Sequence, residues 1–208
     1  MSTAERRRAG PGRPRRFDPE IETRMLFDAA LAVMRRNGFE GASVAEILSE
    51  AGLSTRSFYR SFDSKDDLLR AMYRRNAQGA AERLAARVAR ASSPRDGLEA
   101  WIDSYLGFTY DAPKAERVAV LGSWGARQVE GYQVVEREAF DLLIAPLVEV
   151  LERGLDSGAF PLARPHRDAL TINAIVHDMM HAASGARRLP REEALEHCLR
   201  FCLPALGA

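Results

Sequence analysis

The sequence predicts an all-α fold of about nine helices, arranged as an N-terminal head and a larger C-terminal helical body. Apolar residues recur at helical spacing along most of the chain, and serine, aspartate and proline mark the helix starts. No segment shows the alternation or the β-branched enrichment of a strand. The 208 residues are 46% hydrophobic and 28% charged, which is ordinary for a globular protein.

Residues 1–17 are predicted to be a disordered basic arm. Six arginines and one glutamate give residues 1–16 a net charge of +5, whereas the whole chain carries +1. Glycine and proline separate the arginines, and such a composition cannot build a core. The arm either binds nucleic-acid phosphates or is a tail, solubilising or left from cloning. Its Gly-Arg-Pro-Arg-Arg run resembles the centre of an AT-hook, which makes Arg13, Arg15 and Arg16 candidate minor-groove contacts.

The first helix is expected to begin at Asp18-Pro19, an N-cap followed by a proline in the first turn. Its apolar positions recur every three or four residues, as on the buried face of an amphipathic helix. It should end at Asn37-Gly38, since glycine readily takes the left-handed conformation that closes a helix.

Two short helices are predicted next. Ser43 and Glu46 form a capping box that opens a helix over residues 44–51. Gly52 breaks this helix, and a third helix follows over residues 55–61. Two short helices joined by a tight glycine-containing turn are typical of a helix-turn-helix, so the head is a three-helix DNA-binding domain.

A long helix should connect the head to the body. Its start is marked by the capping signature at Ser64, and it extends to about residue 91. The head then covers residues 18–75 and the body residues 76–208. Helices are expected in the body over residues 94–110, 133–156 with a bend at Pro146, 167–183 and 190–203, with an interruption at Pro113.

The run from Thr23 to Leu69 resembles the TetR family of bacterial repressors. The shared features are an Ala-Ala pair in the first helix, Gly-x-x-x-x-Ser before the second, Ala-Gly-Leu-Ser at the turn, Phe-Tyr-Arg-Ser-Phe, and Ser-Lys-Asp-Asp-Leu-Leu. The resemblance implies a homodimer that places two recognition helices in successive major grooves of operator DNA. It also implies a body that dimerises and holds a small-molecule pocket, whose effector releases the repressor from DNA.

The start of the third helix carries the candidate base contacts. In a helix-turn-helix the second helix lies in the major groove, and its N-terminal residues meet the base edges. These residues are Thr55, Arg56 and Ser57. Many family members have a small residue where this chain has Arg56, and an arginine can bond guanine O6 and N7 together. The alternative is that Arg56 only binds phosphate.

Four further residues are candidate contacts to the DNA backbone. Tyr59 matches the family tyrosine whose hydroxyl reaches the backbone, and it should point outwards because Phe58 is expected to be buried. Arg60 is a candidate phosphate ligand. Ser43 and Lys65 lie at helix N-termini, where the amides and the helix dipole favour phosphate.

Aromatic residues in the body are candidates for lining the effector pocket, although an aromatic run is more often core than pocket. Trp101, Tyr105 and Phe108 lie on neighbouring faces of one helix. The chemical identity of the effector is not readable from the sequence, and no cofactor is predicted. The candidate pocket residues are Trp101, Tyr105, Phe108, Trp124, Tyr132 and His177.

No metal site is predicted. His177 and His181 have the i, i+4 spacing of a metal-binding pair, but no third ligand is assured, so hydrogen-bonded histidines are the favoured interpretation. Cys198 and Cys202 should lie buried on one helix face without a disulfide, as expected in a reducing compartment.

The sequence predicts a regulator and not an enzyme, because it has no phosphate-binding loop, nucleophile elbow or acid–base cluster. No apolar run reaches the ~20 residues of a membrane helix, and no secretory signal is present, so a cytoplasmic location is expected. The last two helices carry more apolar residues than one buried face needs, which favours a four-helix dimer interface over intrachain core alone. The alternative function is a helical ligand-sensing or interaction protein with weak or unspecific DNA binding.

Overall fold

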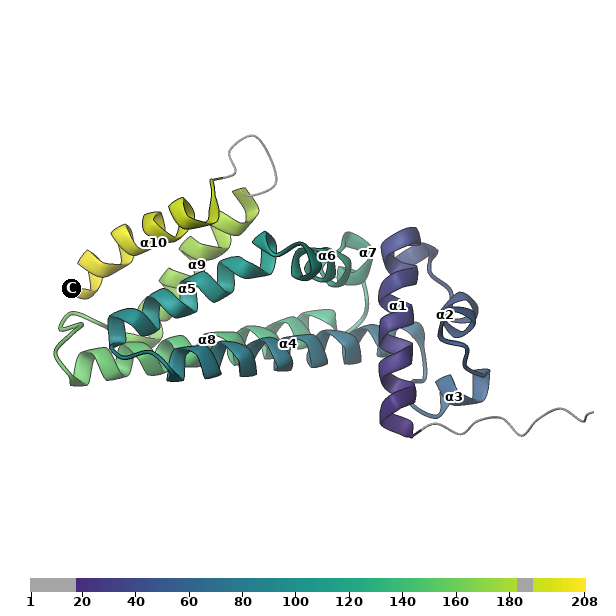
Figure 1. Cartoon of the computed structure of the whole chain (residues 1–208). Helices are drawn as coiled ribbons and strands as arrows, with labels where there is room; N and C mark the ends of the chain where they lie inside the picture. Colours follow the sequence, from purple (N-terminus) through teal and green to yellow (C-terminus); the bar gives the residue numbers. More distant parts are fainter. Residues whose placement is uncertain (1–17, 183–188) are drawn as a thin grey trace, which may run out of the picture.

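The computed structural model describes residues 18–182 and 189–208, and every regular element within them is an α-helix (Figure 1). The predicted all-α class is confirmed. In chain order the helices are α1 (Pro19–Gly41), α2 (Val44–Ala51), α3 (Thr55–Tyr59), α4 (Lys65–Ala89), α5 (Pro94–Tyr110), α6 (Ala112–Leu121), α7 (Trp124–Arg127), α8 (Tyr132–Asp156), α9 (Pro165–Ala182) and α10 (Arg191–Leu206).

Two of the predicted helix starts, at Asp18-Pro19 and at Ser64, are confirmed by capping hydrogen bonds. The Asp18 side chain accepts from the Glu20 amide, and the Ser64 hydroxyl accepts from the Asp67 amide. The expected interruption at Pro113 is present but short, since Pro113 lies in the first turn of α6. Proline is tolerated there because the amide it lacks has no intrahelical acceptor. The short helices α6 and α7 fill a stretch for which the sequence predicts no element, because neither is long enough to show a periodic pattern.

The head consists of α1, α2 and α3 around one apolar cluster. Leu26, Ala30, Ile47 and Phe58 are fully buried in it, and Phe62 is 6% exposed. The expected burial of Phe58 is therefore confirmed, and Phe62 is buried in the same cluster. Complete burial of a side chain the size of phenylalanine contributes about 1.5–3 kcal/mol, so Phe58 alone is a strong anchor for the five-residue α3.

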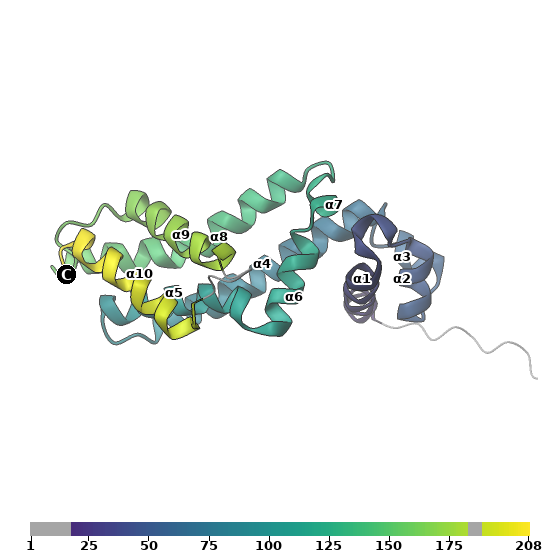
Figure 2. The ribbon, with the colours of Figure 1, turned by 90° about the horizontal axis from the view of Figure 1, so that it is seen from above.

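The body extends from one side of the head. Figures 1 and 2 show α4 and α8 running side by side along its length, with α5, α9 and α10 packed at the end away from the head. A second apolar cluster fills this end and contains Trp101, Leu147, Val176 and Cys198. No helix within residues 18–182 or 189–208 is both long and apolar enough to cross a membrane.

The head and the body share a packed joint. The head cluster takes in Leu121 from α6, Ala126 from α7 and Tyr132 from the start of α8. Arg35 on α1 forms an ion pair with Glu116 on α6 at 3.1 Å. The predicted division between residues 75 and 76 falls in the middle of α4, which runs through it without a break. A movement of α4, α6 or the start of α8 would consequently displace the helices of the head.

Candidate nucleic-acid interface

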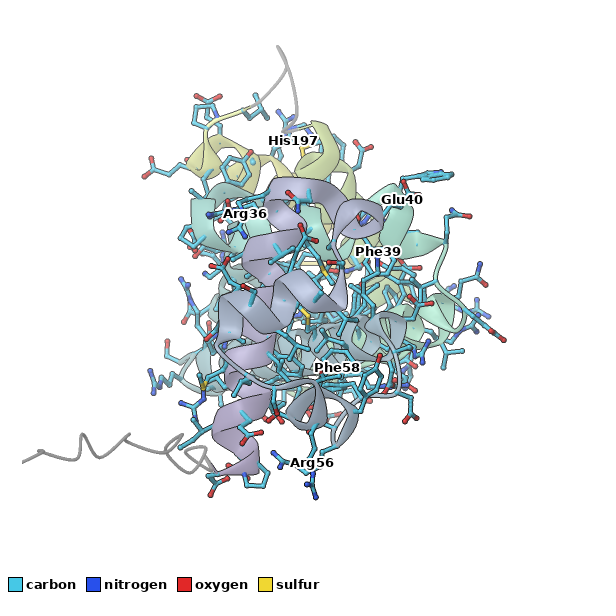
Figure 3. The ribbon with its side chains drawn as sticks, turned by 90° about the vertical axis from the view of Figure 1, so that its right-hand side faces the viewer. Arg36, Phe39, Glu40, Arg56, Phe58 and His197 are labelled. Carbon is cyan, nitrogen blue, oxygen red and sulfur yellow. The ribbon has the colours of Figure 1, made fainter. Side chains whose placement is uncertain are left out.

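The outer face of α3 is exposed to solvent, whereas its inner face packs into the core of the head. Thr55 and Arg56 are exposed, and Tyr59 is 57% exposed, whereas Phe58 between them is fully buried. The expected split of the Phe58-Tyr59 pair is confirmed. Figure 3 shows Arg56 projecting from the edge of the head while Phe58 points into it. The guanidinium of Arg56 is therefore available to a partner lying against α3.

The turn before α3 sets the angle of this face. Gly52 closes α2 with φ of +64°, a left-handed conformation that a side chain would strain. The Ser54 hydroxyl then caps α3 by accepting from the Ser57 amide, and the two serine hydroxyls lie 3.2 Å apart. Ser57 is half-buried, so of the three candidate base contacts it is the least accessible.

The Ser43 hydroxyl is engaged within the head. It donates to Glu46 Oε2 at 2.7 Å and accepts from the Glu46 amide, and the Ser43 amide also donates to this carboxylate. These hydrogen bonds hold the pKa of Glu46 below its usual range. The capping box is confirmed, but a phosphate at this helix start would have to displace the Glu46 carboxylate. The predicted phosphate contact of Ser43 stays a prediction.

The Lys65 ammonium is also engaged. It donates to the carbonyl oxygens of Phe39 at 2.7 Å and Ala42 at 2.8 Å, lies 3.5 Å from that of Glu40, and sits 4.3 Å from the centre of the Phe39 ring. An ammonium has three hydrogens, so these carbonyl oxygens at the end of α1 and just after it occupy its donors. Lys65 thus ties the end of α1 to the start of α4, which the sequence did not indicate.

Arg60 forms an ion pair with Glu22 of α1. The Glu22 side chain is 4% exposed and that of Arg60 is 39% exposed. A buried carboxylate needs such a partner, because desolvation without compensation is costly. The sequence carries a signal for this pair, since Glu22 falls four residues before Leu26 on the apolar face of α1. The predicted phosphate contact of Arg60 would have to use donors that Glu22 leaves open.

The candidate arm contacts Arg13, Arg15 and Arg16 lie outside the described residues. Within the described residues, the candidate interface therefore consists of α3 and its flanks. Thr55, Arg56 and Tyr59 are exposed on α3. Ser43, Arg60 and Lys65 are engaged in contacts within the head, although Ser43 and Arg60 are also exposed.

Three of the candidate pocket residues come together in the body. Trp101 and Tyr105 stack with ring centres 4.7 Å apart, and Tyr105 contacts Phe108 at 5.1 Å. The Trp101 indole donates to the Leu143 carbonyl at 3.0 Å. Burial raises the pKa of Tyr105. Asn173 is 6% exposed, and its amide nitrogen has no hydrogen-bond partner among the described residues.

Of the other three candidate pocket residues, Trp124 is on α7, Tyr132 on α8 and His177 on α9. Tyr132 belongs to the head cluster, and its hydroxyl donates to the Leu121 carbonyl at 3.0 Å. Trp124 is 71% exposed on α7, and His177 is exposed on α9. The side chain of His181 lies outside the described set, and within that set no three histidine, cysteine or acidic side chains gather as a metal site would require.

The matching region of known proteins coincides with this head. Residues 26–72 match the model of a family described as bacterial regulatory proteins, tetR family. A stretch of 58 residues is 41% identical to the HTH-type transcriptional repressor BdcR of Escherichia coli (strain K12) and makes up 28% of this chain. The match spans 27% of the length of BdcR, so it relates the heads of the two proteins and not their bodies.

Solved structures match over nearly the whole chain. A protein of Pseudomonas aeruginosa PAO1 superimposes with a TM-score of 0.78 and 23% identity, over 93% of this chain and 94% of that one. The transcriptional regulator FadR of Bacillus subtilis, solved in complex with stearoyl-CoA, has a TM-score of 0.74 and 16% identity, over 88% and 98%. At these identities the likeness establishes a common fold. The sequence over residues 26–72 thus matches the tetR family of bacterial regulatory proteins, and the chain as a whole has the fold of the matched structures.

Proposed function

We propose that the chain is a sequence-specific DNA-binding repressor that places α3 in the major groove of its operator. The observation that carries the proposal is the pairing of Phe58 and Tyr59. Phe58 fixes α3 from inside the head, while Tyr59 and the neighbouring Arg56 are exposed on its outer face. A short helix presented rigidly, with an arginine at its N-terminal end, is the geometry that base reading requires.

Two of these chains are proposed to bind one operator. α9 and α10 place part of their apolar surface in the core of the body, but Leu170 and Phe201 are each 54% exposed. Ile175, Met179 and Leu195 are half-buried beside them. Large apolar side chains on the outside of two adjacent helices favour a protein interface. A second copy of the same two helices would cover them as a four-helix bundle.

A small, largely apolar effector is proposed to bind the body and release the operator. Support comes from the contact between Trp101, Tyr105 and Phe108, and from Asn173 beside them. A buried amide nitrogen without an acceptor among the described residues is costly, and a polar atom of a ligand could satisfy it. FadR of Bacillus subtilis, which has the same fold, was solved with stearoyl-CoA.

The alternative is a helical sensor whose head binds DNA weakly and without sequence preference. The two differ in what a random pool of duplexes yields when it is selected on the purified chain at near-physiological salt. Base reading predicts a palindrome whose half-sites are about one helical turn apart, as two symmetry-related α3 helices would impose. Recovery of no motif from wild-type protein that binds the pool, together with a strong salt dependence, would support the alternative.

Arg56→Ala is the variant to select in parallel. The proposal expects the palindrome to survive with its preference relaxed at one or two base pairs per half-site, because the remaining contacts still fix the register. An unchanged motif would mean that Arg56 contacts only the phosphate backbone and no base. Arg90→Gln provides a matched control, since Arg90 is an exposed arginine at the far end of α4.

A further inference from the structure

A charged cleft lies at the joint between the head and the body. It has a volume of about 470 Å³, and its walls come from α1, α4 and α6. Figure 1 shows α2 and α3 on one side of α1 and the body on the other, so the cleft lies on the body side, away from the outer face of α3. Four arginines line it, namely Arg24, Arg75, Arg83 and Arg117.

These four arginines differ from the other arginines of the same helices. Arg35 on α1 and Arg74 and Arg87 on α4 are each paired with a carboxylate of a neighbouring helix, at 3.1, 2.8 and 2.6 Å. Within residues 18–182 and 189–208, none of the four cleft arginines forms such an ion pair. Asp28 and Glu82 also line the cleft, so two carboxylates face four guanidinium groups. The cleft keeps an excess of positive charge.

The floor of the cleft is apolar. Met72 and Leu121 are buried at 6% and 3% exposure, and Phe27 and Leu31 are half-buried beside them. The Arg75 guanidinium lies over the Phe27 ring at 5.8 Å. An apolar floor below a rim of unpaired arginines fits a ligand that is itself amphipathic. The volume is within the range of about 300–1,000 Å³ for small-molecule sites.

We propose that this cleft binds an amphipathic organic anion, a carboxylate or phosphate attached to an apolar chain. The head group would bond the arginines, whose planar fork matches both anions in a bidentate manner. The chain would cover Phe27, Leu31 and Met72. This site is separate from the aromatic group at Trp101, because it lies at the opposite end of the body and draws on the head itself.

A ligand in the cleft would act on the orientation of the head. It would touch α1, which carries α2 and α3, and at the same time α4 and α6 of the body. Occupancy would therefore favour one angle between head and body over others, by as much as its affinity differs between them. This regulatory consequence rests on the proposed DNA-binding function, whereas the binding itself does not.

Binding is tested on the full chain by calorimetry with decyl phosphate, decanoate, decanol and inorganic phosphate, all below micelle-forming concentrations. Both decyl anions are expected to bind at one site per chain. Decanol lacks the charge, so it should bind at least about tenfold more weakly than decyl phosphate, which corresponds to the loss of one charge-assisted hydrogen bond or more. Inorganic phosphate lacks the apolar chain, so it should also bind at least about tenfold more weakly. Equal binding of decanol and the two anions would overturn the proposal.

Two variants address the two halves of the cleft. Arg83→Gln with Arg117→Gln removes rim charge and should weaken decyl phosphate at least about tenfold. Gly79→Leu fills the cleft, because a Cβ on Gly79 meets only the end of the Arg83 side chain, at 3.2 Å. Leucine is a better helix former than glycine, so this variant should fold at least as well as the parent and yet lose decyl phosphate.

The matched control is Arg90→Gln with Arg95→Gln, two exposed arginines at the far end of α4 and the start of α5. It should bind decyl phosphate as the parent does. Equal weakening in the control and in the rim variant would contradict a specific site, as would unchanged binding in Gly79→Leu. Since these titrations contain no DNA, their outcome is independent of whether selection recovers an operator.

Discussion

Two arginines near α3 illustrate how a single contact decides the role of a side chain. Arg56 is exposed at the start of the helix, whereas Arg60 at its end is held by Glu22. Their sequence contexts are alike, and both were predicted to contact DNA. The difference depends on α1, which brings a buried carboxylate beside one arginine only. Ion pairs between helices that are distant in the sequence depend on tertiary packing. The sequence therefore shows that Glu22 is a charged residue on an apolar helix face, but it does not identify Arg60 as its partner.

Arg60→Ala should destabilise the chain by about 1–3 kcal/mol, because it leaves the Glu22 carboxylate buried without a partner. Urea unfolding followed by circular dichroism measures this change. Adding Glu22→Gln to Arg60→Ala should recover part of the loss, since a neutral amide is less costly to bury than a charge. Arg36→Ala, which breaks an exposed pair with Glu50, is the control and should change the stability much less than Arg60→Ala does. A similar loss for Arg36→Ala and Arg60→Ala would contradict the account.

The two cysteines are predicted to be chemically inert in the folded chain. Burial raises the pKa of Cys198 to about 11 and that of Cys202 to about 12. At pH 8 the reactive thiolate is then scarce, so labelling by a disulfide reagent should be more than about 100-fold slower than after unfolding in urea. Rapid labelling of the native chain would show that α10 opens readily.

The same two thiols predict a loss of stability at alkaline pH. The folded chain keeps protons that the unfolded chain gives up above about pH 9, the ordinary pKa of the thiol. The unfolded state then binds fewer protons than the native state, and the free energy of unfolding falls as the pH rises from 9 towards 11. Thermal unfolding at a series of pH values measures this slope, and a flat profile over that range would contradict the assigned burial.

At the scale of elements, the sequence predicts most of the head because its signals are local. The capping box at Ser43, the glycine turn at Gly52 and the cap at Ser64 act within four residues of the chain, and each is present. What could not be predicted lies between elements. Lys65 is the example: its position at the start of α4 suggested a phosphate, but its ammonium reaches back to carbonyls at the end of α1.

Lys65→Met separates these two roles. If Lys65 ties α1 to α4, the variant should lose about 1–3 kcal/mol of stability, because two partly buried carbonyls lose a charged donor. The slope of log affinity for DNA against log salt concentration should then stay as in the parent. A phosphate contact would instead reduce that slope by about 1 with little effect on stability. Chemical unfolding and DNA titration at several salt concentrations, on the same preparation, distinguish the two results.

At the scale of the molecule, the head and the body are joined by shared packing and not by a linker. Leu121, Ala126 and Tyr132 of the body complete the core of the head, and α4 passes through both parts. No local pattern predicts this joint, because the contributing residues come from α6, α7 and the start of α8, which are far from α1 in the sequence. The cleft at the same joint combines residues of three helices, so it could not be predicted from the sequence either.

Charges on the exposed apolar face of α9 and α10 should break a dimer that uses this face. Leu170→Glu with Phe201→Glu places charges on the exposed apolar face of α9 and α10 and should convert a dimer to monomers in sedimentation experiments. Val134→Glu, which changes a 56% exposed residue of α8, should leave the dimer intact. Dissociation in the control alone, or persistence of the dimer in the double variant, would place the interface elsewhere.

The most direct test of base reading by α3 is the affinity of Arg56→Ala for the selected operator and for a scrambled duplex of the same length, beside the wild-type chain. Base reading by Arg56 predicts a loss of about 1–3 kcal/mol on the operator and an almost unchanged affinity for the scrambled duplex, because a base contact contributes to binding of the operator only. An equal loss on both duplexes, or no loss on the operator, would mean that α3 does not read sequence through this residue.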